Sequence, residues 1–231
     1  MQSKTAGTDA RRLPDEFYRD VARLETDPLC PELCAYNARD FGALSRFARE
    51  RLPGSRAVPF WGLVWPGSRA LARLVLDRAD EFAGRRLLDL GCGSGLAAVA
   101  AARAGCKATG IDLDPLALDV ARRMAAANEV TCDWRAGDAF ALGDDELNRF
   151  DCIVAGDLFY EDGLSKRALA FLERAGQNGR RVFVADPDRG EERLRRERRL
   201  RVALRLRVPV YPLLENVRER DVTIYAWDAA R

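Results

Sequence analysis

The sequence of 231 residues contains no histidine. Histidine is the commonest general base at neutral pH and a frequent zinc ligand. Its absence excludes a serine–histidine–aspartate triad, a histidine general base and most zinc sites. The six cysteines form no Cys-x-x-Cys pair, and four of them lie in or beside expected strands or a glycine-rich loop. We therefore expect buried thiols in a reducing compartment rather than disulfides, and no bound metal.

Long apolar runs and a strong charge of either sign are also missing. No stretch approaches the roughly 18 apolar residues that cross a bilayer. The N-terminus lacks the apolar core of a secretory signal, and the formal net charge is only +2. These observations argue against a membrane protein and make nucleic acid an unlikely partner. We expect a cytoplasmic protein, or a mitochondrial-matrix protein if the source is eukaryotic, and leave the oligomeric state open.

Glycine, in contrast, is concentrated in Arg86-Leu-Leu-Asp-Leu-Gly-Cys-Gly-Ser-Gly-Leu96. The apolar run before the glycines predicts a buried parallel strand, and residues 96–103 predict a helix. Gly91, Gly93 and Gly95 allow a sharp turn and a close approach of a ligand to the backbone. The N-terminus of the helix adds free N–H groups. The segment predicts a nucleotide-type site, with a glycine-rich packing turn as the alternative.

A second strand, expected over Lys107–Ile111, ends at Asp112, which follows Gly95 by 112 − 95 = 17 residues. An acidic residue near this distance meets ribose hydroxyls in Rossmann-like folds. A carboxylate suits that place because it accepts two charge-assisted hydrogen bonds. We therefore assign Asp112 to a ribose. Asp114, which precedes Pro115, is expected to cap the next helix.

Two further acids follow expected strands. A strand over Thr131–Arg135 closes on Asp138, which either accepts from an adenine amine or is a loop acid without a ligand. Phe150–Ala155 runs into Asp157, at the sheet edge where open α/β sheets bind ligands. The remaining strands are expected over 181–185, 200–208 and 222–227. The pattern predicts a Rossmann-like, doubly wound, seven-stranded α/β sheet whose last strand is antiparallel.

The chain divides by composition into three parts. A polar beginning is expected to be a disordered tail, the next part is expected to be a helical N-terminal extension, and the remainder is the α/β domain. These parts are residues 1–12, 13–57 and 58–231. Within the extension we expect helices from Asp15 to Leu24 and from Pro31 to Arg51.

An aromatic segment, Val58–Ser68, precedes an amphipathic helix that Ser68 is expected to cap. The two tryptophans of this segment, Trp61 and Trp65, are expected to form a wall over a ligand, unless the segment only packs the extension onto the domain. Arginines crowd residues 189–207 further on. We interpret them, Arg189 included, as a solvated face with i,i+4 pairs such as Glu191–Arg195 and Glu192–Arg196. An RNA-binding stripe is the alternative.

The motif Asp89-x-Gly91-x-Gly93-x-Gly95 resembles motif I of the S-adenosylmethionine (SAM) methyltransferases. The acids that follow it stand in the order of the seven-stranded members, over about residues 58–230. Pro59–Leu71 and Gly156–Tyr160 are similar to methyltransferase family 16, and most similar to its electron transfer flavoprotein β-subunit lysine methyltransferases. Pro31–Leu33 and Asp186-Pro187 also match that subfamily. The order Gly-Cys-Gly-Ser-Gly departs from the order of small residues expected there.

The resemblance implies SAM as cofactor and a protein substrate that presents a lysine, possibly the electron transfer flavoprotein β subunit. Methylation of a small amine or of RNA is the alternative. The resemblance to the family implies that the cofactor binds at Trp65, Asp89, Gly91, Gly93, Gly95, Asp112 and Asp138. Asp157 and Tyr160 match the family's Asp-x-x-Tyr/Phe motif at the acceptor amine.

We assign Asp157 the role of an anchor that orients the acceptor, and not that of a strong base. The alternative for Asp157 is an N-cap of the helix that follows its strand. Tyr160 is expected to form a wall of the acceptor channel. A base-amine methyltransferase would show Asn/Asp-Pro-Pro-Tyr where this chain has Asp-Leu-Phe-Tyr, and the Pro-Cys pair typical of 5-methylcytosine enzymes is absent.

Overall fold

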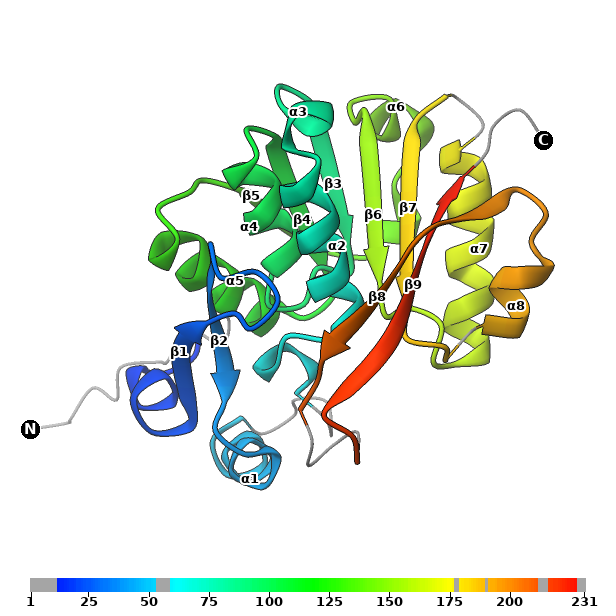
Figure 1. Ribbon diagram of the computed structural model, residues 1–231. Helices are drawn as coiled ribbons and strands as arrows, with labels where there is room; N and C mark the ends of the chain where they lie inside the picture. The colour runs from blue at the N-terminus through cyan, green and yellow to red at the C-terminus, as the bar shows by residue number, and fades with distance from the viewer. Residues whose placement is uncertain (1–11, 53–58, 177–178, 190, 212–215, 228–231) are drawn as a thin grey trace, which may run out of the picture.

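The computed structural model describes residues 12–52, 59–176, 179–189, 191–211 and 216–227. Its centre is a seven-stranded sheet in the order β5-β4-β3-β6-β7-β9-β8 (Figure 1). The strands are β3 (Arg86–Leu90), β4 (Lys107–Asp112), β5 (Asp133–Ala136), β6 (Cys152–Gly156), β7 (Arg181–Asp186), β8 (Leu200–Pro209) and β9 (Glu219–Trp227). Strands β3 to β7 are parallel, and β9 pairs antiparallel with both β7 and β8. The predicted doubly wound sheet with an antiparallel last strand is confirmed.

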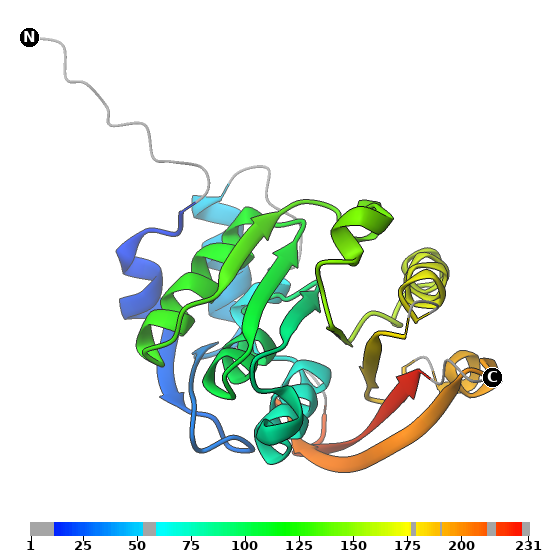
Figure 2. The same ribbon diagram turned by 90° about the horizontal axis from the view of Figure 1, so that it is seen from above.

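Helices cover both faces of the sheet (Figure 2). One face carries α2 (Pro66–Asp77), α3 (Ala79–Phe82), α4 (Leu96–Arg103) and α5 (Pro115–Ala127), and the other carries α6 (Asp144–Leu147), α7 (Asp162–Gly176) and α8 (Glu191–Arg196). Because successive side chains of a strand alternate, Leu87 packs in the core under the first group and Leu88 in the core under the second. Burial on both faces explains the continuous apolar run of β3.

The helix starts follow local chemistry. The Asp114 carboxylate accepts from the Leu116 N–H at 2.9 Å, so the predicted cap of α5 is confirmed. The predicted cap at Ser68 is wrong. Pro66 occupies the first position of α2 and Trp65 is the N-cap residue, so Ser68 lies inside the helix. Proline at that position fixes the start because its φ is already helical and no N–H is lost.

The N-terminal extension is mixed rather than helical, which corrects the prediction for residues 13–57. A single helical turn, Phe17–Val21, is followed by β1 (Ala22–Thr26) and β2 (Cys34–Ala38), which form an antiparallel hairpin, and then by α1 (Phe41–Arg51). The expected helices are therefore wrong over residues 22–24 and 31–38. The predicted tail, apart from Arg12, and residues 53–57 lie outside the described part of the chain.

A local turn and a distant side chain together explain why the hairpin forms. The Asp27 carboxylate accepts from the N–H groups of Leu29 and Cys30 and so closes the turn between the strands. The side chain of Asn128, at the end of α5, donates to the Cys34 carbonyl and accepts from the Cys34 N–H, as a neighbouring strand would. The hairpin is thus held by contacts that helix propensity does not include.

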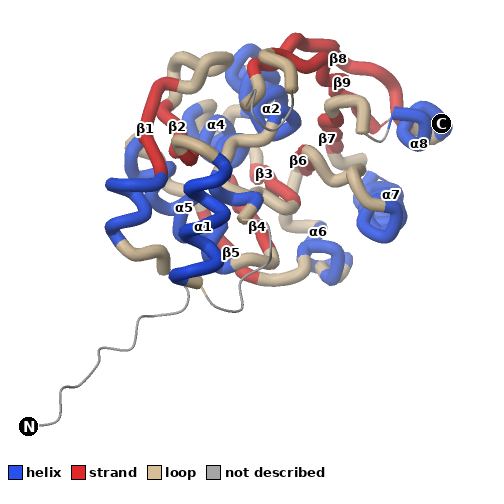
Figure 3. The backbone as a smooth tube through the Cα atoms, turned by 90° about the horizontal axis from the view of Figure 1, so that it is seen from below, coloured by secondary structure: helices blue, strands red, loops and turns tan. Residues whose placement is uncertain are grey.

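The extension lies against α5 rather than across the sheet (Figure 3). Phe17 and Trp61 pack with Val120 in one apolar cluster. Beside that cluster the buried Asp119 of α5 accepts from the Tyr18 hydroxyl at 2.9 Å. No helix among the residues placed in the structure is long and apolar enough to cross a membrane.

Candidate active site

A cavity of about 350 Å³ opens at the carboxyl ends of the parallel strands. The register brings these ends together, because Leu90 pairs with Ile111 on one side and with Ala155 on the other. The predicted site residues that line the cavity are Trp65, Gly91, Gly93, Asp112, Asp138, Asp157 and Tyr160. Asp89 and Gly95 do not line it. No residue of the extension between 13 and 52 lines it either.

The three motif glycines divide into two kinds. Gly91 and Gly93 have φ of +66° and +53°, and a Cβ on Gly93 would meet no atom within 4 Å. They line the cavity with bare backbone. A Cβ on Gly95 would instead lie 2.7 Å from the ring of Trp134, and a Cβ on Gly110 would lie 2.4 Å from the same ring. The alternative of a glycine-rich packing turn therefore describes Gly95.

Asp89 supports the glycine loop from behind. It is buried, and its Oδ2 accepts from the Ala98 N–H in the first turn of α4 at 3.1 Å. Burial raises the pKa of the Asp89 carboxyl to about 7, because the charged form loses its hydration. Because the Asp89 carboxylate binds the helix, the geometry gives it a role in positioning α4.

Two carboxylates line the cofactor side of the cavity. Asp112 accepts from the Gly93 N–H at 2.8 Å and from the Asp114 N–H at 2.9 Å, which joins the glycine loop to the turn before α5. Asp138 accepts from the Phe140 N–H at 3.0 Å and pairs with Arg167. Asp112 is the last residue of β4, and Asp138 is the second residue after β5.

Asp157 belongs to a different arrangement. Its φ is +57°, in the left-handed region that non-glycine residues seldom adopt. Its Oδ2 accepts from the Ser68 N–H at 3.2 Å, and the Gly67 N–H also contributes. Asp157 therefore caps the N-terminus of α2. The alternative, an N-cap of the helix after its own strand, is wrong because α7 begins only at Asp162.

A glycine makes this approach possible. A Cβ on Gly67 would lie 2.5 Å from the Asp157 Oδ2 and 2.9 Å from the Ala185 carbonyl oxygen. Likewise, a Cβ on Gly156 would lie 2.8 Å from the Ser68 nitrogen. The helix terminus can meet the ends of β6 and β7 only because both positions lack side chains.

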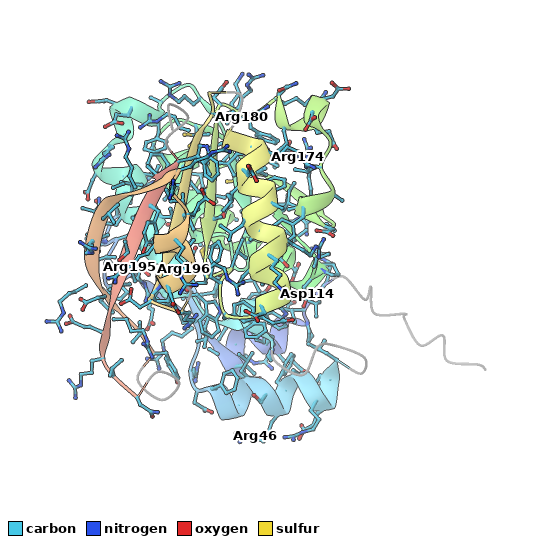
Figure 4. All side chains as sticks on the ribbon, turned by 90° about the vertical axis from the view of Figure 1, so that its right-hand side faces the viewer. Arg46, Asp114, Arg174, Arg180, Arg195 and Arg196 are labelled. Atoms are coloured by element: carbon cyan, nitrogen blue, oxygen red, sulfur yellow. The ribbon has the colours of Figure 1, made fainter. Side chains whose placement is uncertain are left out.

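Arg189 is a cavity residue that the sequence analysis placed among the solvated arginines. Its Nη1 lies 3.4 Å from the Asp157 Oδ1, and its guanidinium lies 5.3 Å from the centre of the Trp65 ring. The signal that could have found it is its place just after the end of β7, the same sheet edge as Asp157. Arg195 and Arg196, in contrast, lie on α8 (Figure 4). The predicted Glu192–Arg196 pair is confirmed, and the Glu191 side chain lies outside what the structure describes.

Burial and neighbouring charges act in opposite directions on Asp157. Its side chain is 10% exposed, and burial raises the pKa of its carboxyl to about 7. Arg189 and the N–H groups at the start of α2 oppose that shift, and Asp186 reinforces it. A carboxylate so placed changes charge near neutral pH, which is unusual outside functional sites.

Aromatic rings form the wall beside Asp157. The Phe60 ring lies 5.7 Å from that of Trp65 and 5.9 Å from that of Tyr160. The Trp65 Nε1 donates to the Phe60 carbonyl oxygen at 2.7 Å. Phe60 and Tyr160 are 42% and 50% exposed, so they form the rim. An apolar channel that ends at a carboxylate fits an alkyl chain that carries a cation.

Comparison with known proteins agrees with this geometry. A methyltransferase domain model matches residues 87–188, from β3 to just beyond β7. The chain is 35% identical over 181 residues to the electron transfer flavoprotein beta subunit lysine methyltransferase of Xenopus laevis, covering 77% of this chain and 72% of that protein. It is 33% identical over 140 residues to the protein of the same name from Danio rerio, covering 58% of this chain and 52% of that one. The chain thus spans about half to three quarters of these relatives.

A solved structure shares the fold at low identity. Magnesium protoporphyrin IX methyltransferase from Synechocystis, crystallised with S-adenosylhomocysteine, superposes with a TM-score of 0.52 at 13% identity. The match covers 81% of this chain and 99% of that one.

The strand order and the glycine cradle are those of the SAM-dependent methyltransferases. Within that class, the chain belongs to the family of the electron transfer flavoprotein beta subunit lysine methyltransferases. The predicted resemblance is confirmed, and SAM is the cofactor of this family.

The residues present fit that cofactor. Gly93 faces open space that a side chain would fill, and the carboxylates of Asp112 and Asp138 offer acceptors for hydroxyl and amine groups. Among the described residues, no group of three or more His, Cys, Asp or Glu side chains could hold a metal ion.

Proposed function

We propose that this protein transfers a methyl group from SAM to the ε-amine of a lysine side chain on a protein, and that the protein is the β subunit of electron transfer flavoprotein. The observation that carries the proposal is a single cavity that is lined by Asp157, by the aromatic residues Phe60, Trp65 and Tyr160, and by the glycine cradle. The names of the relatives support the substrate.

On the cofactor side, we propose that Gly91 and Gly93 hold the methionine part, Asp112 the ribose and Asp138 the adenine amine, with Trp65 along the border. SAM supplies a methyl group on a positively charged sulfur. Asp89 and Gly95 act indirectly in this proposal, because they fix α4 and the loop rather than line the cavity.

On the acceptor side, Asp157 attracts and orients the incoming ammonium, and Tyr160 and Phe60 enclose its alkyl chain. The amine must lose its proton before it can react, and the low polarity of the channel favours the neutral form. Water would take the ammonium proton first, and the neutral amine beside Asp157 would then present its lone pair to the methyl group that bound SAM would supply, with S-adenosylhomocysteine as the second product. Alignment supplies much of the rate, so Asp157 acts as an anchor.

We also propose a reducing location, the cytoplasm or, for a eukaryotic source, the mitochondrial matrix. All six cysteines are free thiols, and four of them are buried. The domain division at residue 58 stays a proposal as well.

The test is methyl transfer from labelled SAM to purified electron transfer flavoprotein of the source organism, followed by mass spectrometry of its lysines. The expected result is label on β-subunit lysines with wild-type protein and very little with Asp157→Asn. Label only in RNA or in small molecules from a lysate, or no label in any fraction, would overturn the proposal.

A further inference from the structure

We propose that Arg189 is a positioning residue for this transfer: it favours the ionised form of the Asp157 carboxylate and aligns it in the free protein, and its charge favours the neutral form of the amine that Asp157 receives. The inference rests on the proposed function and adds a residue to its acceptor side.

The position of Arg189 is fixed by two contacts of different kinds. Its Nη1 lies 3.4 Å from the Asp157 Oδ1, whereas the Ser68 N–H is bound by the other oxygen, Oδ2. Its guanidinium lies over the Trp65 ring at 5.3 Å, a distance at which cation and ring attract. The arginine therefore lies between the carboxylate and the aromatic wall, inside the cavity.

The charges around Asp157 leave Arg189 as its principal counter-ion. From α2 it meets the N–H groups of Gly67 and Ser68, and from β7 it meets the carboxyl of Asp186, which opposes ionisation. From the loop that carries Asp157, Tyr160 lines the same cavity. Arg189, which follows β7, is the strongest of the influences that favour the ionised carboxylate.

An incoming ammonium group meets both charges. The Asp157 Oδ1 has two lone pairs, so it can accept from Arg189 and from the acceptor together. The guanidinium remains charged at any working pH, so the acceptor, and not the arginine, releases a proton when two cations share one carboxylate. Arg189 thus promotes the neutral amine that the reaction requires without touching the transferred methyl group.

The sign of a substitution follows from this arrangement. In Arg189→Gln, the free carboxylate loses its counter-ion and the bound amine loses its repelling neighbour. The first change raises the pKa of the Asp157 carboxyl, and the second raises the pKa of the bound amine. The acid limbs of the pH profiles of kcat/KM and of kcat therefore both shift to higher pH. An opposite charge at this distance moves a carboxyl pKa by about one unit or more. We expect kcat/KM at pH 7 to fall on the order of tenfold and to recover above pH 9.

The experiment measures pH–rate profiles of wild type, Arg189→Gln, Arg189→Lys and the control Arg196→Gln, whose arginine pairs with Glu192 on the exposed face of α8. The lysine variant is expected to restore most of the wild-type profile, and the control is expected to match it. Equal loss at every pH in Arg189→Gln, an unshifted profile, or a lysine variant no better than the glutamine variant would overturn the proposal.

A second readout does not depend on methyl transfer. The carboxyl carbon of Asp157, identified by its loss in Asp157→Asn, is titrated by NMR in the free protein. Its titration is expected to move to higher pH in Arg189→Gln, and an unchanged midpoint would contradict the role of Arg189. If the wild type methylates no lysine, the proposed function fails, and this titration still decides whether Arg189 controls Asp157.

Discussion

The two sides of the cavity are built in different ways. On the cofactor side, Asp112 binds Gly93, 19 residues away, and Asp138 binds Phe140, two residues away. On the acceptor side, Asp157 binds Ser68, 89 residues away, and Arg189, 32 residues away. Asp138 also pairs with Arg167, 29 residues away, so the contacts of the two cofactor-side carboxylates span at most 29 residues. The Asp157–Ser68 contact on the acceptor side spans 89 residues.

The acceptor side consequently depends on how α2 is placed. Arg69, one turn from Trp65 on α2, is buried and donates to the Asp27 Oδ2 at 2.7 Å and to the Pro209 carbonyl oxygen. Helix α2 therefore contacts the N-terminal hairpin, the end of β8 and Asp157, which caps its N-terminus. A change far from the cavity can reach the acceptor side by this route.

The variant with the largest expected effect, Asp157→Asn, tests whether the acceptor side acts separately from the cofactor side. We expect methyl transfer to fall by about a hundredfold or more, because a preorganised charge at the acceptor is lost. The dissociation constant for S-adenosylhomocysteine, measured by calorimetry, is expected to change less than about twofold, because the cofactor side is independent. Full turnover by the variant, or a large loss of cofactor affinity, would show that the two sides are not separate.

The next test concerns the ion pair that holds α2, the helix capped by Asp157. Asp27→Ala removes one partner of a fully buried ion pair and leaves Arg69 without its counter-ion. Such a loss costs about 3 kcal/mol of unfolding free energy, which denaturant titration measures. The control is Glu192→Gln, which removes an exposed pair worth about 0.5 kcal/mol or less. Equal stability of the two variants would contradict the anchoring role of the Asp27–Arg69 pair.

A third variant addresses packing beneath the cofactor loop. Gly110→Ala would bring a Cβ within 2.4 Å of Trp134. Overpacking of this kind costs about 1–3 kcal/mol, and the melting temperature is expected to fall accordingly. Trp134→Leu in the same chain should recover part of the loss, because the two nearest contacts of the added methyl group are then removed and only the Cys92 sulfur, at 2.9 Å, remains of the three nearest atoms. A melting temperature as high as that of wild type in the single variant would show that the tryptophan moves aside freely.

The smallest expected effect concerns the ribose position. Asp112→Asn keeps the shape of the side chain and removes its charge, so S-adenosylhomocysteine is expected to bind about tenfold more weakly, since a hydrogen bond to a charged group is worth about 1.5 kcal/mol or more. At saturating SAM, kcat is expected to stay close to wild type. A fall in kcat with unchanged affinity would place Asp112 on the acceptor side and remove the distinction.

The sequence predicted the sheet because its signals are local. The apolar run of β3, the motif glycines and the acids after β4, β5 and β6 are each readable within a few residues. It failed at the hairpin of β1 and β2, where Asn128 and Arg69 supply partners from far along the chain. It also failed at Ser68, where Pro66 starts the helix one turn earlier.

The sequence by itself determined that the chain has a doubly wound α/β fold and which acids stand at the ends of its strands. Only the tertiary structure decided which of those positions face the cavity, that Gly95 and Asp89 do not, and that Arg189 does. The physical reason is that strand and turn chemistry acts between near neighbours in the chain. The charge state and the position of a buried carboxylate such as Asp157 depend on groups that only folding brings within a few ångströms.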